Sequence, residues 1–243
     1  MDDGPTSEGG GLIAPTVEPD LPIRADEVRE RLAAVRARVA RAGGGRPVDI
    51  VAVTKGFGPD AVEAAIDAGV TAIGENYAQE LLAKATAGAG GLQTRWHFIG
   101  SVQRNKVAML APHVALWQTV DRLSLAESIA DHAPGAAVLV QVNLAAMPHR
   151  GGCAWTEAPD LVAAARSAGL DVRGVMGVGP GGPPGASRAG FAALADLARA
   201  LGLTTVSMGM TGDLEVAVAE GSTMVRVGTA LFGPRPGQGD LRR

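Results

Sequence analysis

Apolar residues along this chain come in short runs that alternate with longer segments of helical periodicity. From residue 49 onward, eight runs rich in Val, Leu, Ile and Ala have the length and composition of buried strands. The segments between them repeat apolar residues every three or four positions, which is typical of amphipathic helices. The expected strands are 49–54, 70–74, 96–100, 113–120, 136–144, 170–178, 203–209 and 223–231. The expected helices are 59–69, 78–87, 102–111, 122–133, 158–169, 191–202 and 212–221.

This alternation predicts an α/β fold. Repeated strand–helix units place parallel strands under a layer of helices, and eight units favour one closed (β/α)8 barrel of the TIM type. The segment after Leu231 is too rich in Gly and Pro to supply the eighth helix. An extra N-terminal helix at 24–42 has apolar residues at helical spacing and is expected to close the ring instead. A doubly wound open sheet is the weaker alternative.

The two ends of the 243-residue chain lack this periodicity. Residues 1–22 are predicted to be a flexible arm and 234–243 a flexible tail, which leaves 23–233 as the barrel domain. No apolar run reaches the roughly 18 residues of a membrane span, and the N-terminus does not resemble a signal peptide. The single cysteine, Cys153, excludes an intramolecular disulfide and fits a reducing compartment. We therefore expect a cytoplasmic protein without a membrane partner.

Charge and composition exclude two further classes of function. The formal net charge of −3 gives no reason to expect nucleic-acid binding. The four histidines show no metal-ligand spacing and the cysteine has no companion, so we expect no metal site. No nucleophile-elbow motif supports a Ser-His-Asp triad.

Lysine is rare in this chain, and one lysine stands where chemistry is expected. There are three: Lys55, Lys84 and Lys106. Lys55 ends the first expected strand, and in such barrels the carboxyl ends of the strands carry the site. A desolvated lysine can act as a nucleophile, whereas a rim lysine can also simply extend to water. Lys84 is expected to be solvated on its helix, and Lys106 to be structural.

The loops after the seventh and eighth strands have the composition of a phosphate-binding cup. Barrels often bind phosphate there, using backbone N–H groups, hydroxyls and a helix N-terminus. The candidate residues are Ser207, Gly209, Thr211, Gly212, Gly228 and Thr229. Alternatively, Thr211 or Asp213 only caps the following helix. Arg226, among apolar residues of the eighth strand, needs a partner, either in a structural ion pair or in a bound ligand.

Four motifs in this order resemble the pyridoxal phosphate homeostasis protein family, a single-barrel group related to the N-terminal domain of alanine racemase. They are VAVTKGF, GENYAQE, WHFIGSVQRNK and the 27-residue segment 207–233. The resemblance covers about 28–233 and implies a fold-type III pyridoxal 5′-phosphate (vitamin B6) barrel. It implies that Lys55 holds the cofactor as a Schiff base, that Arg226 faces the pyridine nitrogen and that Asn76 lies at the mouth. The implied phosphate ligands are Ser207, Gly209, Thr211, Gly228 and Thr229.

The resemblance implies a non-catalytic protein, a monomer that buffers the cofactor or delivers it to apo-enzymes. An amino-acid racemase is the alternative, and a Schiff-base aldolase acting on a sugar phosphate is a weaker one. Related racemases add a second domain with a tyrosine base, which is not expected here because the chain ends ten residues after Gly233 and holds only Tyr77. The segment 143–156 departs from the family pattern, with His149, Arg150 and Gly151 in place of a lysine-glycine pair. Thr211 replaces a more usual serine, and Gly56 a more usual polar residue.

Overall fold

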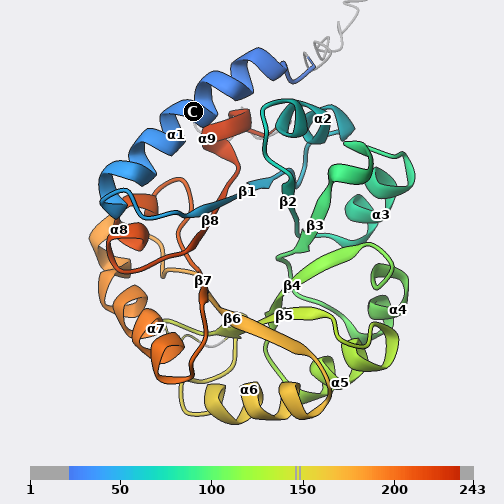
Figure 1. Ribbon diagram of the computed structural model, residues 1–243, viewed down its shortest axis with the longest axis vertical. Helices are drawn as coiled ribbons and strands as arrows, with labels where there is room; N and C mark the ends of the chain where they lie inside the picture. The colour runs from blue at the N-terminus through green and yellow to red at the C-terminus, as the bar shows by residue number, and fades with distance from the viewer. Residues whose placement is uncertain (1–21, 146, 148, 236–243) are drawn as a thin grey trace, which may run out of the picture.

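A computed structural model describes residues 22–145, 147 and 149–235 of the chain, and most of the predicted arm and tail lies outside them. Eight parallel strands form a closed barrel in chain order, with β8 beside β1 (Figure 1). The (β/α)8 prediction is confirmed and the open-sheet alternative is wrong. The strands are β1 (Asp49–Val53), β2 (Ala72–Glu75), β3 (Arg95–Phe98), β4 (Val114–Val120), β5 (Ala137–Val142), β6 (Asp171–Gly177), β7 (Thr205–Ser207) and β8 (Met224–Val227). The α-helices are α1 (Ala25–Gly43), α2 (Pro59–Asp67), α3 (Ala78–Thr86), α4 (Val107–Leu110), α5 (Leu123–His132), α6 (Ala158–Ser167), α7 (Arg188–Ala200), α8 (Leu214–Ala219) and α9 (Thr229–Phe232).

Two elements differ in type from the prediction, and several others differ only in their bounds, such as β7, which covers 205–207 instead of 203–209. Of the helix expected at 102–111, only Val107–Leu110 is α-helical, and these residues form α4. The 3₁₀ turn η2 (Arg104–Lys106) precedes it. The eighth strand ends at Val227 rather than at residue 231. The amides of Leu231 and Phe232 donate to the carbonyl oxygen of Gly228, so the chain coils into α9 directly after the strand.

Helix α1 closes the ring, as predicted. Its apolar residues at helical spacing form a buried stripe that packs against α2, α8 and α9. Figure 1 shows α1 in blue along the outside of β1 and β8. The helix ends at Gly44, whose φ of 59° is the left-handed conformation that glycine adopts at little cost.

The apolar core has two layers that follow from the alternation of side chains along each strand. The larger layer lies between the barrel and the helices, and a smaller one fills the barrel itself. The inner layer consists of Val51, Ala72, Leu116, Ala137, Leu139, Met176 and Met224. Within the described residues, no helix has the length and apolar character needed to cross a membrane.

Candidate functional site

A cavity of about 360 Å³ opens at the carboxyl ends of the strands, above the inner core layer. Its walls bring together residues from the loops after β1, β2, β3, β6, β7 and β8. The lining residues are Val53, Lys55, Phe57, Asn76, Ile99, Met176, Val178, Met210, Arg226, Gly228, Thr229 and Arg235. Five of the predicted site residues therefore line one cavity: Lys55, Asn76, Arg226, Gly228 and Thr229.

Lys55 stands on a tight turn at the end of β1. The turn is closed by a hydrogen bond from the Phe57 amide to the Thr54 carbonyl oxygen, 3.0 Å long. Gly56 has a φ of 75°, which other residues rarely adopt, and this explains why glycine follows the lysine here. Partial burial lowers the pKa of Lys55, and the nearby cations Arg235 and Arg226 lower it further. The amine is therefore tuned toward its neutral, nucleophilic form.

Arg226 is a buried cation, with 4% of its surface exposed. Its two terminal nitrogens donate to Ser207 Oγ at 2.7 Å and to the carbonyl oxygen of Gly177 at 2.9 Å. Among the described residues, no carboxylate lies within ion-pair distance of it, so the structural ion pair considered for this residue is not formed. Burial lowers the pKa of Arg226 to about 10. A guanidinium held this way at the base of a cavity suits a ligand with acceptor atoms.

Ser207, a predicted phosphate ligand, is not among the residues that line the cavity. Its side chain is fully buried, and the hydroxyl donates to Gln118 Oε1 at 2.7 Å and accepts from Arg226. Gln118 in turn lies 3.0 Å from Nδ1 of His97, also buried in the barrel. In this arrangement Ser207 holds the guanidinium of Arg226.

The rest of the predicted cup is assembled at the cavity rim. The backbone amide of Ala230 donates to Thr211 Oγ1 at 3.3 Å, which ties the loop after β7 to the start of α9. A side chain at position 228 would crowd β1, because an added Cβ would lie 3.1 Å from the Val53 carbonyl oxygen. Gly209 lies behind the loop with a φ of 93°. Its role is to allow the turn rather than to line the cavity.

Asp213 closes the turn that precedes α8. Its carboxylate accepts the Met210 amide at 2.7 Å and a weaker bond from Ser187 Oγ at 3.3 Å.

Asn76 lines both this cavity and a neighbouring hollow, and one of its polar atoms is unpaired. Its Oδ1 is buried and has no hydrogen-bond partner among the described residues. Gly100 packs so closely behind Asn76 that an added Cβ would lie 2.0 Å from the Asn76 carbonyl oxygen. A buried acceptor without a partner is costly, so this atom is suited to meeting a donor on a bound molecule.

Lys84 was predicted to be solvated, and this is wrong. Only 4% of its surface is exposed, and its Nζ lies 2.6 Å from Glu75 Oε1 and 2.8 Å from the Thr54 carbonyl oxygen, to which it donates. Burial raises the pKa of Glu75 while Lys84 opposes the shift. Glu75, which sequence reasoning did not single out, thus lies next to the residue that precedes Lys55. The remaining lysine, Lys106, lies in a different hollow with Tyr77.

The divergent loop after β5 is held by its arginine. Arg150 donates to the carbonyl oxygens of Gly179 and Pro180, at 2.7 and 2.8 Å, and so joins this loop to the one after β6. His149 has a φ of 67°, unusual for a residue with a side chain. Arg150 therefore has a structural role at the rim.

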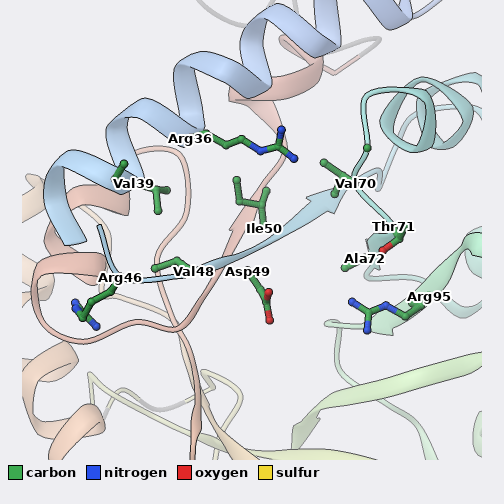
Figure 2. Close-up of a pocket in the computed structure, with 12 residues that line it drawn as sticks. Arg36, Val39, Arg46, Val48, Asp49, Ile50, Val70, Thr71, Ala72 and Arg95 are labelled. Carbon is green, nitrogen blue, oxygen red and sulfur yellow. The ribbon is translucent and has the colours of Figure 1, made fainter. Parts of the chain in front are cut away.

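A second hollow lies at the opposite end of the barrel, where the strands begin. Figure 2 shows Arg36 reaching over it from α1 and Arg95 extending from the start of β3, with Asp49 at the start of β1. The side chains of Arg36 and Arg95 are exposed to solvent. None of the unpaired buried polar atoms found in the described residues lies among its lining residues. Barrels of this kind place their chemistry at the other end, so this hollow is not the candidate site.

Comparisons of the sequence with known proteins identify the family to which this chain is similar. The family model that matches is the alanine racemase N-terminal domain, over residues 23–236. A pyridoxal phosphate homeostasis protein of Pseudomonas aeruginosa is 40% identical over 221 residues, which are 86% of this chain and 96% of that protein. One of Deinococcus radiodurans is 39% identical over 208 residues, covering 83% and 97% of the two chains.

Solved structures show the same relationship. PipY of Synechococcus elongatus with PLP bound has a TM-score of 0.72 and 32% identity, covering 85% of this chain and all of its own. Alanine racemase of Streptomyces lavendulae, at 20% identity and a TM-score of 0.68, shares the fold over 88% of this chain and 58% of its own. The chain belongs to the pyridoxal phosphate homeostasis protein family, within the wider group of alanine racemase N-terminal domains.

Proposed function

We propose that this protein binds pyridoxal 5′-phosphate in the cavity at the mouth of the barrel and serves intracellular homeostasis of that cofactor. The observation that supports this most is the convergence of three groups on one cavity. They are an amine with a lowered pKa on Lys55, a guanidinium without a carboxylate on Arg226 and an unpaired acceptor on Asn76.

The residues present fit the cofactor. Lys55 would hold the cofactor as a Schiff base, because the lowered pKa of its amine favours the neutral, nucleophilic form. We propose Arg226 as the hydrogen-bond donor to the pyridine nitrogen, since this residue lines the cavity. The hydroxyls of Thr211 and Thr229, with backbone amides near Gly228 and α9, would hold the phosphate. Bound pyridoxal phosphate acts as an electron sink when amino acids react with it.

The same site supports storage or delivery better than turnover. Arg226 keeps a positive charge beside the proposed place of the pyridine nitrogen, which disfavours the protonated ring that makes the cofactor the strongest electron sink. A racemase needs a second base opposite the lysine. Tyr77 is 59% exposed and lies with Lys106 in the neighbouring hollow, not among the lining residues of the Lys55 cavity. We therefore propose little or no turnover of amino acids.

The covalent part of the proposal is tested by absorption spectroscopy. The purified protein with added pyridoxal phosphate should show a visible imine band, and borohydride should fix a pyridoxyl group on the peptide that carries Lys55. The Lys55→Ala variant should lose the band, whereas Lys106→Ala, as a matched lysine control, should keep it. A reduced pyridoxyl group on the peptide of Lys84 or Lys106 would contradict the assignment. The absence of any imine band would remove the cofactor proposal and leave the aldolase hypothesis to be tested.

The non-catalytic part is tested by isotope exchange. The cofactor-loaded protein is incubated with alanine and other amino acids in deuterated water, and exchange at the α-carbon is followed by NMR. Enzyme-like exchange that disappears in Lys55→Ala would favour the racemase alternative. Delivery to apo-enzymes, the monomeric state and the cytoplasmic location stay predictions.

A further inference from the structure

We infer that Lys84, Glu75 and Glu80 form a positioning network that holds the Lys55 turn from behind and balances the charge that Lys55 experiences. The inference rests on the proposed role of Lys55 as the cofactor's anchor. It concerns residues of α3 and β2 that do not line the cavity, so they act through Lys55 and are not catalytic residues.

The network holds both residues that flank Lys55. On one side, Lys84 Nζ donates to the Thr54 carbonyl oxygen at 2.8 Å, and Thr54 Oγ1 donates to Glu75 Oε1 at 2.6 Å. On the other side, the Gly56 amide donates to Glu80 Oε2 at 2.8 Å. Lys84 and Glu80 lie one helical turn apart on α3, and their charged atoms are 3.7 Å apart. One helix face therefore fixes the backbone on either side of Lys55.

The burial of this network is what makes its charges matter. Glu75 and Thr54 are fully buried and Lys84 is 4% exposed, so their interactions are poorly screened by water. Glu75 Oε2 is buried and has no partner among the described residues, so this carboxylate has spare acceptor capacity. In the folded protein the Lys84 cation compensates the Glu75 anion, and the pair is close to neutral as a unit.

Four charged groups act on Lys55. Arg235 and Arg226 lower its pKa, whereas Glu75 and Glu80 raise it, against a larger lowering by burial. Removing Lys84 takes away the cation that opposes the raised pKa of Glu75. At the alkaline pH where lysine amines titrate, we expect the remaining carboxylate to be an uncompensated anion that stabilises the Lys55 ammonium. Removing the charge of Glu75 takes away an anion that raises the pKa of Lys55, so the ammonium is destabilised. The two changes are therefore expected to act in opposite directions on the same amine.

The experiment measures the amine directly and needs no cofactor. Lysines are labelled with acetic anhydride across a pH series, and peptide mass spectrometry gives the midpoint for Lys55, with Lys106 as an internal reference. We expect the midpoint to rise by about half a pH unit or more in Lys84→Met and to fall by a similar amount in Glu75→Gln. In the double variant, which is again neutral, it should return close to the wild-type value. Lys106→Met, a lysine outside the network, should leave it unchanged.

Shifts of the same sign in both single variants, or no shift in either, would overturn the inference, because a loosened turn cannot produce opposite signs. If Lys84→Met does not fold, the isosteric Glu75→Gln variant decides alone, since a midpoint that does not fall refutes the charge balance. A separate titration with pyridoxal phosphate follows the imine band of each variant. Because the labelling midpoints do not depend on that band, failure of the cofactor proposal and failure of this inference are distinguishable.

Discussion

Replacing Arg226 with methionine should destabilise the free protein by no more than about 3 kcal/mol, although the residue is deeply buried. Burial lowers the pKa of Arg226 from its ordinary value to about 10. A shift of that size means that folding disfavours the charged form by about 3 kcal/mol. The unfolded chain therefore binds the extra proton more tightly, and the cost applies in full at every pH below 10.

Methionine removes this cost and loses two hydrogen bonds. The bonds to Ser207 Oγ and to the Gly177 carbonyl oxygen have a charged donor, so they contribute about 1.5–3 kcal/mol each. Ser207 keeps its bond to Gln118, and among the described residues no carboxylate is left behind without its cation. This differs from breaking a buried ion pair, which costs about 3–5 kcal/mol because one charge is left alone. The expected change in the free energy of unfolding lies between zero and a loss of about 3 kcal/mol.

The assay is urea unfolding of the cofactor-free protein at pH 7, followed by far-UV circular dichroism. Arg173→Met is the control, because Arg173 forms an exposed pair with Asp171 whose loss should change stability by less than about 1 kcal/mol. In parallel, the affinity of Arg226→Met for pyridoxal phosphate should fall about tenfold or more, since a charge-assisted bond is lost. A loss of stability clearly above about 3 kcal/mol would refute the argument and show that Arg226 is a structural residue.

Three further predictions concern the cup and the barrel interior. Pyridoxal without its phosphate should bind far more weakly than the phosphate ester, and Thr211→Ala should narrow the difference; equal affinities in the wild-type protein would contradict the phosphate cup. Gly209→Ala should destabilise the protein by more than Gly69→Ala, because both have positive φ but only at Gly209 would an added Cβ meet Ala217 Cβ, at 2.5 Å. Burial lowers the pKa of His97 to about 4, so the unfolded state binds more protons between pH 6.5 and pH 4. Stability should fall by up to about 3 kcal/mol over that range, and His97→Gln should remove this part of the loss in pH-dependent urea unfolding.

The barrel and most of the cavity could be predicted because both follow from local patterns and chain order. Alternation of strands and helices determines which residues stand at the carboxyl ends of strands, and this placed Lys55, Arg226 and Gly228 around one opening. Depth within the barrel could not be predicted in the same way. It depends on the stagger between neighbouring strands, which a strand's own sequence does not show. Ser207 faces the interior, as alternation allows, but it does not line the cavity.

The error over Lys84 has a different origin, and it bears on how the site works. Lys84 follows Leu81 by three residues, so the two share a helix face. The apolar Leu81 predicts that this face is buried, and both residues are buried in the structure. A lysine on such a face needs an anion, and Glu75 at the end of β2 provides it. This pair is compensated and stiffens the wall behind Lys55. In the cavity itself, Arg226 has no carboxylate partner among the described residues, and Asn76 Oδ1 is unpaired. The charge of the buried lysine that supports the anchor is thus compensated within the protein, whereas Arg226 and Asn76 keep hydrogen-bonding capacity for a bound molecule, which is the division expected of a preorganised binding site.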